Sequence, residues 1–228
     1  MSHSYFITGT DTDVGKTWIA LALLHALHRQ GYRTLAMKPV ACGCVVTDGI
    51  YQNDDAVKLQ RQASIAVPYR EINPYALPAP VAPHLAAARI GLQIDMDRIR
   101  QLYEQQKNKA DYVVMEGVGG WMVPLNADST TADMVKAMDI PVILVVGIRL
   151  GCLNHALLTQ AAIQQQGVRL VGWIANCIDK DCLEIENNID ALRERLNAPL
   201  LGIIPWQEEF NVQSIGDRLD IEKLIKIT

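Results

Sequence analysis

The segment at residues 9–17 constrains this chain more than any other part of its sequence. It reads Gly-Thr-Asp-Thr-Asp-Val-Gly-Lys-Thr and lies between an apolar run, Ser4 to Thr8, and a helical pattern, Thr17 to Gln30. A glycine loop between a strand and a helix turns several backbone N–H groups toward one point, where the helix dipole also favours an anion. Lys16 adds a cation, and Thr17 offers a hydroxyl to Mg²⁺. Although five residues rather than the usual four separate the two glycines, we predict that this loop binds the phosphates of a nucleoside triphosphate.

Short β-rich runs alternate with longer amphipathic stretches along the rest of the chain. The predicted strands are Ser4 to Thr8, Thr34 to Lys38, Tyr112 to Glu116, Pro141 to Val146, Arg169 to Asn176 and Leu200 to Pro205. The predicted helices are Thr17 to Gln30, Asp54 to Gln62, Asp95 to Lys107, Thr131 to Met138, Leu153 to Gln166 and Leu183 to Leu196. This order predicts an α/β fold of the P-loop NTPase type, in which helices cover both faces of a doubly wound, mainly parallel sheet in three layers.

A glycine after the first helix and a proline-rich run refine this prediction. Gly31 is placed to end the first helix, because glycine adopts the left-handed conformation that closes a helix at low cost. The run Asn73 to Pro83 holds too many prolines for a helix or a central strand, so we expect an excursion at the rim of the sheet.

Length and charge limit the possible partners. The 228 residues fit one domain spanning residues 1–228. The net charge of -4 gives no positive field for nucleic acid or a membrane surface, so we expect neither as a partner. The five cysteines are an odd number with no paired CxxC spacing, which indicates reduced thiols, and no signal peptide is apparent. We expect a cytoplasmic protein that acts on a small molecule.

Two charged residues end predicted strands beside the phosphate loop. Glu116 closes the apolar run from Tyr112 and precedes Gly117, while Lys38 closes the run from Thr34. The carboxyl ends of parallel strands face the ligand crevice, so both side chains are expected there. A carboxylate in that position can hold Mg²⁺, and a lysine can stabilise the charge that develops in phosphoryl transfer or bind an anionic substrate group.

Three further segments are candidates for the site. Asp54 and Asp55 open a predicted helix; one carboxylate is expected to be its N-cap and the other to be free for metal, and the residues alone do not choose between them. The turn Leu150 to His155 leads from a strand into a helix and is either a second anion site or an ordinary turn. Asn176 follows the fifth strand and is a candidate for contact with the nucleotide base.

With these residues together, the chain resembles the dethiobiotin synthetase family from end to end. The segments that carry the resemblance are residues 9–17, Lys38-Pro39-Val40-Ala41, Asn53 to Ala56, Asn73-Pro74-Tyr75, Pro83-His84, Glu116 to Trp121, Leu150 to His155, Trp173 to Asn176 and Pro205-Trp206. Membership would imply that 7,8-diaminononanoate, CO₂ and ATP become dethiobiotin, ADP and phosphate. The implied steps are carbamate formation on one amine, phosphorylation of the carbamate to a carbamic-phosphoric anhydride, and ring closure by the other amine.

The resemblance also implies roles for individual residues. Lys16 and Lys38 would be catalytic, and Thr17, Asp55 and Glu116 would bind Mg²⁺, which selects Asp55 over Asp54. The implied nucleotide-binding residues are Asp13, Val14, Gly15, Lys16, Thr17, Trp18, Asp55, Glu116, Gly117, Val118, Gly119, Asn176, Pro205, Trp206 and Gln207. The implied substrate-binding residues are Thr12, Lys38, Cys42, Leu150, Gly151, Cys152 and Asn154.

Two details of the resemblance bear on the substrate site. The substrate carboxylate would be taken by the turn from Leu150 to Asn154 of a partner subunit, so the working unit would be a homodimer. Cys42 stands where the family usually has a serine, and a thiol is a weaker hydrogen-bond donor than a hydroxyl. The residues after Trp206 match the family poorly, so the resemblance implies no role for any residue beyond Gln207.

Two other classes of P-loop protein are compatible with the phosphate loop. ATPases that position plasmids or division machinery carry an extra lysine early in this loop, whereas residues 10–13 here contain none. Amide ligases of the cobyric-acid type need a glutaminase domain, for which we expect no room in this chain. Both classes are therefore disfavoured.

Overall fold

Six parallel strands form the centre of the protein in the computed structural model, which describes residues 2–227. Their order across the sheet is β10-β9-β8-β1-β7-β2, and every neighbouring pair is parallel. The strands are β1 (His3–Gly9), β2 (Thr34–Met37), β7 (Tyr112–Glu116), β8 (Val142–Ile148), β9 (Leu170–Cys177) and β10 (Leu200–Ile204). The predicted parallel sheet is confirmed, with small differences at the strand ends.

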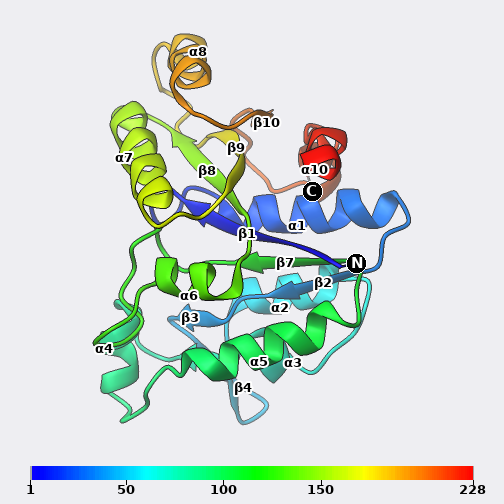
Figure 1. Ribbon diagram of the computed structural model, residues 1–228, viewed down its shortest axis with the longest axis vertical. Coiled ribbons are helices and arrows are strands. Elements are labelled where there is room, and N and C mark those ends of the chain that lie inside the picture. Colours follow the sequence, from blue (N-terminus) through cyan, green and yellow to red (C-terminus); the bar gives the residue numbers. More distant parts are fainter. Residues whose placement is uncertain (1, 228) are drawn as a thin grey trace.

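Helices cover both faces of this sheet (Figure 1). They are α1 (Lys16–Arg29), α2 (Asp54–Gln62), α3 (Tyr69–Ile72), α4 (Pro83–Ala88), α5 (Met96–Lys107), α6 (Thr131–Met138), α7 (Cys152–Gln165), α8 (Ile185–Arg195), α9 (Val212–Gly216) and α10 (Ile221–Ile227). Helices α1, α9 and α10 pack on one face, and α5, α6, α7 and α8 on the other. Within residues 2–227, no helix is both long and apolar enough to span a bilayer.

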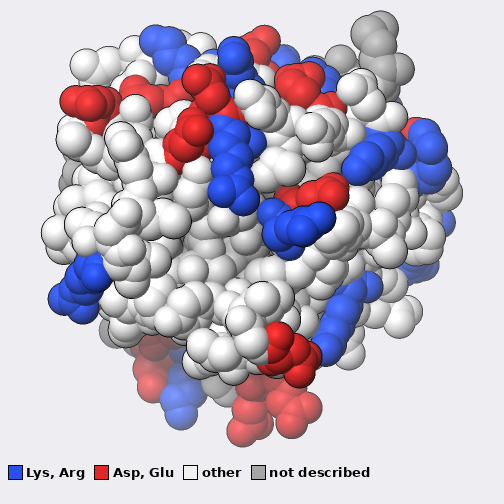
Figure 2. All heavy atoms as spheres, turned by 90° about the horizontal axis from the view of Figure 1, so that it is seen from below, with Lys and Arg blue, Asp and Glu red and all other residues white. Residues whose placement is uncertain are grey.

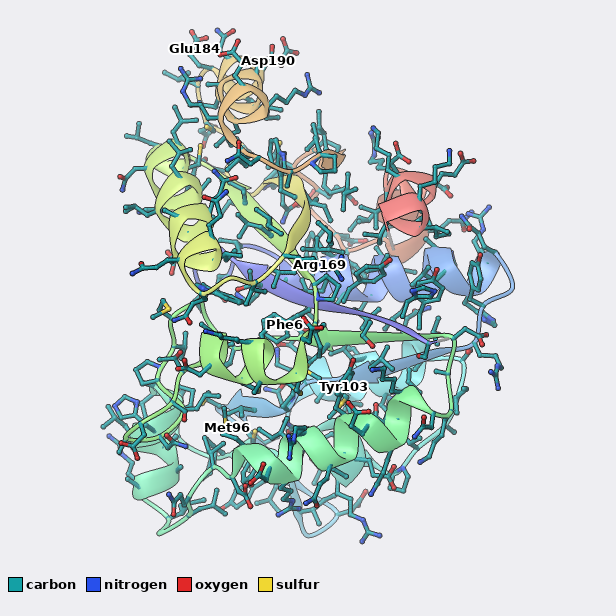
Figure 3. All side chains as sticks on the ribbon, viewed as in Figure 1. Phe6, Met96, Tyr103, Arg169, Glu184 and Asp190 are labelled. Atoms are coloured by element: carbon teal, nitrogen blue, oxygen red, sulfur yellow. The ribbon has the colours of Figure 1, made fainter. Side chains whose placement is uncertain are left out.

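The alternation of side chains along the strands creates the two cores. Tyr5 and Ile7 of β1 point into the cluster that contains α1, whereas Phe6 points into the cluster that contains α5 and α6. Figure 3 shows Phe6 and Tyr103 of α5 in the space between the sheet and that helix, where both are at most 2% exposed. Successive strand residues alternate between faces, so a sheet covered on both sides requires the continuous apolar runs seen in the sequence.

The end of α1 has the predicted glycine closure. Gly31 has a φ of 89°, and its N–H donates to the carbonyl of His28 at 2.9 Å. The Tyr32 N–H donates to the carbonyl of Leu27, so two carbonyls at the end of the helix are satisfied.

Smaller elements lie outside the central sheet. Strand β6 (Tyr75–Leu77), within the proline-rich run, pairs with β3 (Val40–Cys42) in a separate two-stranded sheet, as expected of an excursion. Strands β4 (Val45–Thr47) and β5 (Ile50–Gln52) form a hairpin that the strand pattern did not predict. Figure 2, viewed from the end where β4 lies in Figure 1, shows basic and acidic side chains interspersed around an uncharged area.

The order of the strands determines where a ligand can bind. Strand β1 lies between β7 and β8, and the chain leaves β1 and β7 toward opposite faces of the sheet. Parallel sheets bind ligands outside the carboxyl ends of the strands at such a reversal. Gly9 and Glu116, which end β1 and β7, therefore lie at the same edge.

Candidate functional site

The loop between β1 and α1 is shaped to bind an anion. Asp13 and Gly15 have φ values of 58° and 91°, and such left-handed residues turn neighbouring N–H groups into a concave surface. A Cβ on Gly9 would lie 2.5 Å from the Val14 side chain, so only glycine allows the loop to close. Helix α1 starts at Gly15 without a side-chain cap, which leaves its first N–H groups available to phosphate oxygens.

Glu116 joins the phosphate loop to the end of β2. Its Oε1 accepts hydrogen bonds from Lys38 Nζ at 2.6 Å and from Thr17 Oγ1 at 2.7 Å. Its Oε2 is buried and accepts no hydrogen bond from any residue in the described part of the chain. A buried carboxylate oxygen with no donor is unfavourable unless a ligand completes it.

Lys38 is a buried cation held between two carboxylates. It is 5% exposed, and its Nζ donates to Asp55 Oδ2 at 3.2 Å as well as to Glu116. Burial lowers the pKa of Lys38, but the negative charges of Glu116 and Asp55 more than offset this and raise the pKa above its ordinary value. The carbonyl of Lys38 accepts a hydrogen bond from Asn73 Nδ2 at 2.6 Å, which fixes its backbone. Lys38 therefore remains charged and in place.

Lys16 is the second cation of the site and differs from Lys38 in its charge state. Its Nζ donates to the carbonyl of Asp11 at 2.8 Å. Burial lowers the pKa of Lys16 to about 8; Glu116 opposes this shift and Lys38 adds to it. A bound triphosphate would restore the favourable environment of the ammonium group.

We expect ATP binding to weaken as the pH rises through about 8, because free Lys16 then loses the proton that a triphosphate requires. Binding at pH 8.5 should take up protons, whereas binding at pH 6.5 should not do so through Lys16. Calorimetry in two buffers with different ionisation enthalpies measures this uptake. In Lys16→Arg the uptake should disappear, since arginine stays charged. Equal proton uptake at both pH values would contradict this assignment.

A cavity of about 460 Å³ extends from the phosphate loop to the residues after β10. This size suits a small-molecule ligand. The predicted site residues that line it are Thr12, Asp13, Gly15, Lys16, Thr17, Trp18, Asp55, Glu116, Gly119, Asn176, Pro205, Trp206 and Gln207. The structure thus brings most of the predicted phosphate, metal and base residues to one cavity.

Other predicted residues lie outside the lining of this cavity. Val14 is buried in the phosphate loop, and Lys38 lies behind Glu116 and Asp55. Gly117 packs so closely on Phe6 that a Cβ would lie 2.7 Å from the ring, and Val118 packs on the α5–α6 core. Cys42 ends β3 and is partly buried, which raises the pKa of its thiol. The roles of these residues toward a ligand remain predictions.

The turn before α7 is also outside the cavity. Leu150 is 97% exposed, and Cys152 is buried. Helix α7 follows Gly151, which provides no side-chain cap, and the N–H of its first residue, Cys152, donates to the carbonyl of Arg149. The second anion site at this turn stays a prediction. Arg149, which precedes the turn, donates to Asp11 of the phosphate loop at 2.6 Å. Asn154 lies on the first turn of α7. The turn from Leu150 to Asn154 therefore follows a residue that contacts the phosphate loop, but it does not line the cavity.

The predicted cap of α2 is wrong. Neither Asp54 nor Asp55 caps the helix; the Asn53 side chain accepts hydrogen bonds from the N–H groups of Asp55 and Ala56. Asn and Asp can both cap a helix, and the position of the first turn decides which of the three residues does. Asp54 is exposed, whereas Asp55 pairs with Lys38 and lines the cavity. The choice of Asp55 as a metal ligand stays a prediction.

Asn176 is fixed by a hydrogen bond to the phosphate loop. It is 4% exposed, and its Nδ2 donates to the carbonyl of Val14 at 2.9 Å. Its side chain also packs against Gly15, where a Cβ would collide with it. Asn176 therefore stabilises the loop in addition to lining the cavity.

Five cavity residues were not found from the sequence: Leu21, Lys58, Cys177, Ile178 and Phe210. Lys58 lies one helical turn after Asp55 on α2, a spacing that places both on one face. Phe210 follows the last residue to which the resemblance assigned a role. An aromatic residue in an otherwise polar segment is the signal that could have found it.

The comparisons with known proteins agree with this geometry. The model of the AAA domain family matches residues 3–214. A relative from Xanthomonas oryzae pv. oryzae (strain PXO99A), an ATP-dependent dethiobiotin synthetase, is 48% identical over 220 residues, covering 96% of this chain and 98% of the relative. A relative of the same name from Aromatoleum aromaticum (strain DSM 19018 / LMG 30748 / EbN1) is 50% identical over 203 residues, covering 89% and 90%.

A solved structure shares the fold at much lower identity. The septum site-determining protein MinD from Pyrococcus horikoshii OT3, complexed with Mg-ADP, superposes with a TM-score of 0.59 and 18% identity, covering 98% of this chain and 89% of that chain. At this identity the likeness concerns the fold alone. It confirms the predicted P-loop architecture.

Proposed function

Because this chain belongs to the family of ATP-dependent dethiobiotin synthetases, we propose that it converts 7,8-diaminononanoate, CO₂ and ATP into dethiobiotin, ADP and phosphate. The observation that carries the proposal is that Lys16 and Glu116 line one cavity, while Lys38 lies directly behind Glu116 and forms an ion pair with it at 2.6 Å. Two buried ammonium groups beside a phosphate-binding loop suit a reaction between a weak anionic nucleophile and a triphosphate.

The proposed reaction has three steps. One substrate amine adds to CO₂ and loses a proton, which gives a carbamate. A carbamate oxygen attacks the γ-phosphorus, and the bond to the leaving ADP oxygen breaks. The second amine then attacks the carbamoyl carbon, phosphate leaves, and the five-membered urea ring closes with loss of a proton.

The two lysines have distinct roles in this proposal. Lys16 contacts the γ-phosphate from the loop, as expected of the lysine at the start of α1. The Lys38 ammonium uses two of its three donors on Glu116 and Asp55, which leaves one for the carbamate. Both cations reduce the repulsion between the anionic nucleophile and the triphosphate while they hold the two in line.

The residues present fit a bound Mg²⁺. The buried Oε2 of Glu116 has no hydrogen-bond donor among residues 2–227, and Thr17 Oγ1 lies 2.7 Å from the other carboxylate oxygen. Thr17, Asp55 and Glu116 would hold the ion together with phosphate oxygens and water, a set of hard oxygen ligands. When bound, Mg²⁺ would neutralise charge on the phosphates. Residues 2–227 contain no group of three or more His, Cys, Asp or Glu side chains that could hold a metal ion. In this proposal the phosphate oxygens supply the further ligands.

Thr17→Val should weaken ATP binding in the presence of Mg²⁺ by about tenfold or more and leave binding without Mg²⁺ nearly unchanged. Valine preserves the shape of the side chain but removes the hydroxyl ligand. Titration of ATP with Mg²⁺ and with a chelator measures the difference. Thr10→Val, in the same loop but outside the cavity lining, is the matched control. Identical Mg²⁺ dependence in Thr17→Val and the wild type would refute the role of Thr17.

The exposed surface around α7 supports a homodimer as the working unit. Leu150 before α7, Leu158 on α7 and Leu183 before α8 are 97%, 63% and 82% exposed, and large apolar side chains that remain exposed are candidates for an interface. The N-terminus of α7 has no side-chain cap and does not line the cavity of its own chain. We propose that it binds the substrate carboxylate of the partner subunit.

Formation of dethiobiotin is the direct test of the proposed function. Purified protein, 7,8-diaminononanoate, bicarbonate, Mg²⁺ and ATP should yield dethiobiotin and ADP in equal amounts, measured by mass spectrometry and a coupled ADP assay. ADP release that does not depend on the diamine, with no dethiobiotin, would instead support a regulatory ATPase.

A further inference from the structure

The backbone of Lys38 is held by a segment that lies far from it in the sequence. Lys38 follows Met37, where the pairing of β2 with β7 ends. Its N–H donates to the carbonyl of Ile72 at 2.9 Å, and its carbonyl accepts from Asn73 Nδ2 at 2.6 Å. Two consecutive residues at the end of α3 therefore bind both backbone polar groups of Lys38.

Asn73 is a buried amide that connects this backbone to Tyr69. It is 3% exposed, and its Oδ1 accepts a hydrogen bond from the Tyr69 hydroxyl at 2.8 Å. A residue before a proline avoids the helical conformation, so α3 ends before Asn73, whose φ is −128°. Pro74 thus helps to end α3 where the Asn73 side chain reaches Lys38.

The Tyr69 hydroxyl extends the hydrogen bonds to α2. It accepts from the N–H of Asn53 at 2.8 Å, and the Asn53 side chain caps α2 through the N–H groups of Asp55 and Ala56. Burial raises the pKa of Tyr69, so its hydroxyl keeps the proton that it donates. Because Asp55 accepts from Lys38 Nζ, these contacts form a closed loop from the carbonyl of Lys38 to its own ammonium group.

We propose that Asn73 and Tyr69 are positioning residues that fix the backbone of Lys38 to α2, so that its ammonium group stays within reach of the carbamate. The inference rests on the proposed function, in which Lys38 acts on that carbamate. The ion pair of Lys38 with Asp55 fixes little by itself, because the carboxylate is 38% exposed. Fully satisfied hydrogen bonds between neutral, buried groups are more rigid, and they remain when the ammonium group binds its substrate.

The first experiment separates the chemical step from nucleotide binding. In Tyr69→Phe and Asn73→Ala, kcat for dethiobiotin formation should fall about 10- to 100-fold, because a small displacement of a reacting group is costly. The Kd for ATP should stay within about threefold of the wild type. In a Lys38→Met background the same substitutions should lower the remaining kcat by less than about twofold, since their effect requires the ammonium group. A similar loss of kcat in both backgrounds would overturn the proposal.

A second experiment follows Lys38 without the reaction. Acetic anhydride acetylates accessible amines, and mass spectrometry of peptides gives the rate at each lysine. Acetylation of Lys38 should be at least about fivefold faster in Tyr69→Phe and Asn73→Ala than in the wild type, because the segment opens locally more often. Lys16 is 7% exposed and lies outside these hydrogen bonds, so its rate should stay within about twofold. Equal acceleration at both lysines would indicate general loosening and would contradict the proposal.

Matched controls test the loss of a comparable hydroxyl and a comparable amide elsewhere. The Tyr75 hydroxyl also accepts a backbone N–H before a helix, that of Asp95, so Tyr75→Phe is the control for the hydroxyl. The Asn126 side chain donates to the carbonyl of Ile94, so Asn126→Ala is the control for the amide. Both variants should retain wild-type kcat and wild-type acetylation of Lys38.

The outcomes separate this inference from a loss of folding and from the proposed function. Tyr69→Phe keeps the ring and removes one oxygen, so it remains informative if a thermal melt shows that Asn73→Ala does not fold. A folded Tyr69→Phe variant with wild-type kcat and wild-type acetylation of Lys38 would overturn the proposal. If the wild type makes no dethiobiotin, but acetylation of Lys38 rises in the two variants alone, the positioning role stands and the proposed function fails.

Discussion

Replacement of Lys38 by alanine is expected to lower kcat for dethiobiotin formation by about 10²- to 10³-fold, with the Kd for ATP changed by less than about threefold. Lys38 does not line the cavity that would receive the nucleotide, so its removal should spare ATP binding. Its remaining donor is proposed to act on the carbamate, whose negative charge moves toward the γ-phosphorus in the transition state. The loss should therefore appear in the chemical step.

The controls for Lys38→Ala address charge and folding separately. Lys38→Met keeps most of the side-chain volume and should be as inactive as the alanine variant. Lys109→Ala removes a lysine that pairs with Glu71 on the surface and should be fully active. Steady-state kinetics, calorimetry with ATP and a thermal melt distinguish the possibilities. Unchanged kcat in a folded Lys38→Ala variant would remove Lys38 from the mechanism.

The sequence was sufficient to predict the phosphate loop and the parallel sheet because both depend on local patterns. The spacing of Gly15, Lys16 and Thr17 between a strand and a helix specifies an anion site without knowledge of distant residues. Glu116 was also predictable, because strand order in such sheets brings strand ends together. The contact of Glu116 with Thr17 is 99 positions apart in sequence and follows from this topology.

The remaining features depend on choices that a local pattern does not determine. Asn53, Asp54 and Asp55 can all cap a helix, and the cap is Asn53 because its backbone is the last extended one, with a φ of −112°. Phe210 reaches the cavity only because α9 docks on α1, a contact between opposite ends of the chain. The β4–β5 hairpin has a local signal in the dipeptide Asp48-Gly49, whose positive φ values of 51° and 78° are those of a type I′ turn.

The effects of substituting Lys38 and Glu116 on the free energy of unfolding should not be additive, because the two side chains form a buried ion pair. In the absence of nucleotide, Glu116→Gln and Lys38→Met should each lower the free energy of unfolding by about 3–5 kcal/mol, because each leaves one buried charge without its nearest partner. The double variant leaves neither charge, so its loss should be smaller than the sum of the single losses by about 2 kcal/mol or more. Urea unfolding of the three variants and the wild type measures this difference.

All three variants should nevertheless make dethiobiotin at no more than about one per cent of the wild-type rate, since kcat loses the charge that Lys38 is proposed to place on the carbamate or the Mg²⁺ ligand that Glu116 is proposed to supply. Recovery of stability without recovery of activity would show that the buried charges are retained for chemistry at the cost of stability. Additive losses in unfolding free energy would contradict the ion pair, because they would mean that each side chain is stabilised by different partners. Asp55, which also accepts from Lys38, provides the internal comparison: Asp55→Asn should cost less stability than Glu116→Gln, because Asp55 is 38% exposed and Glu116 is 1% exposed.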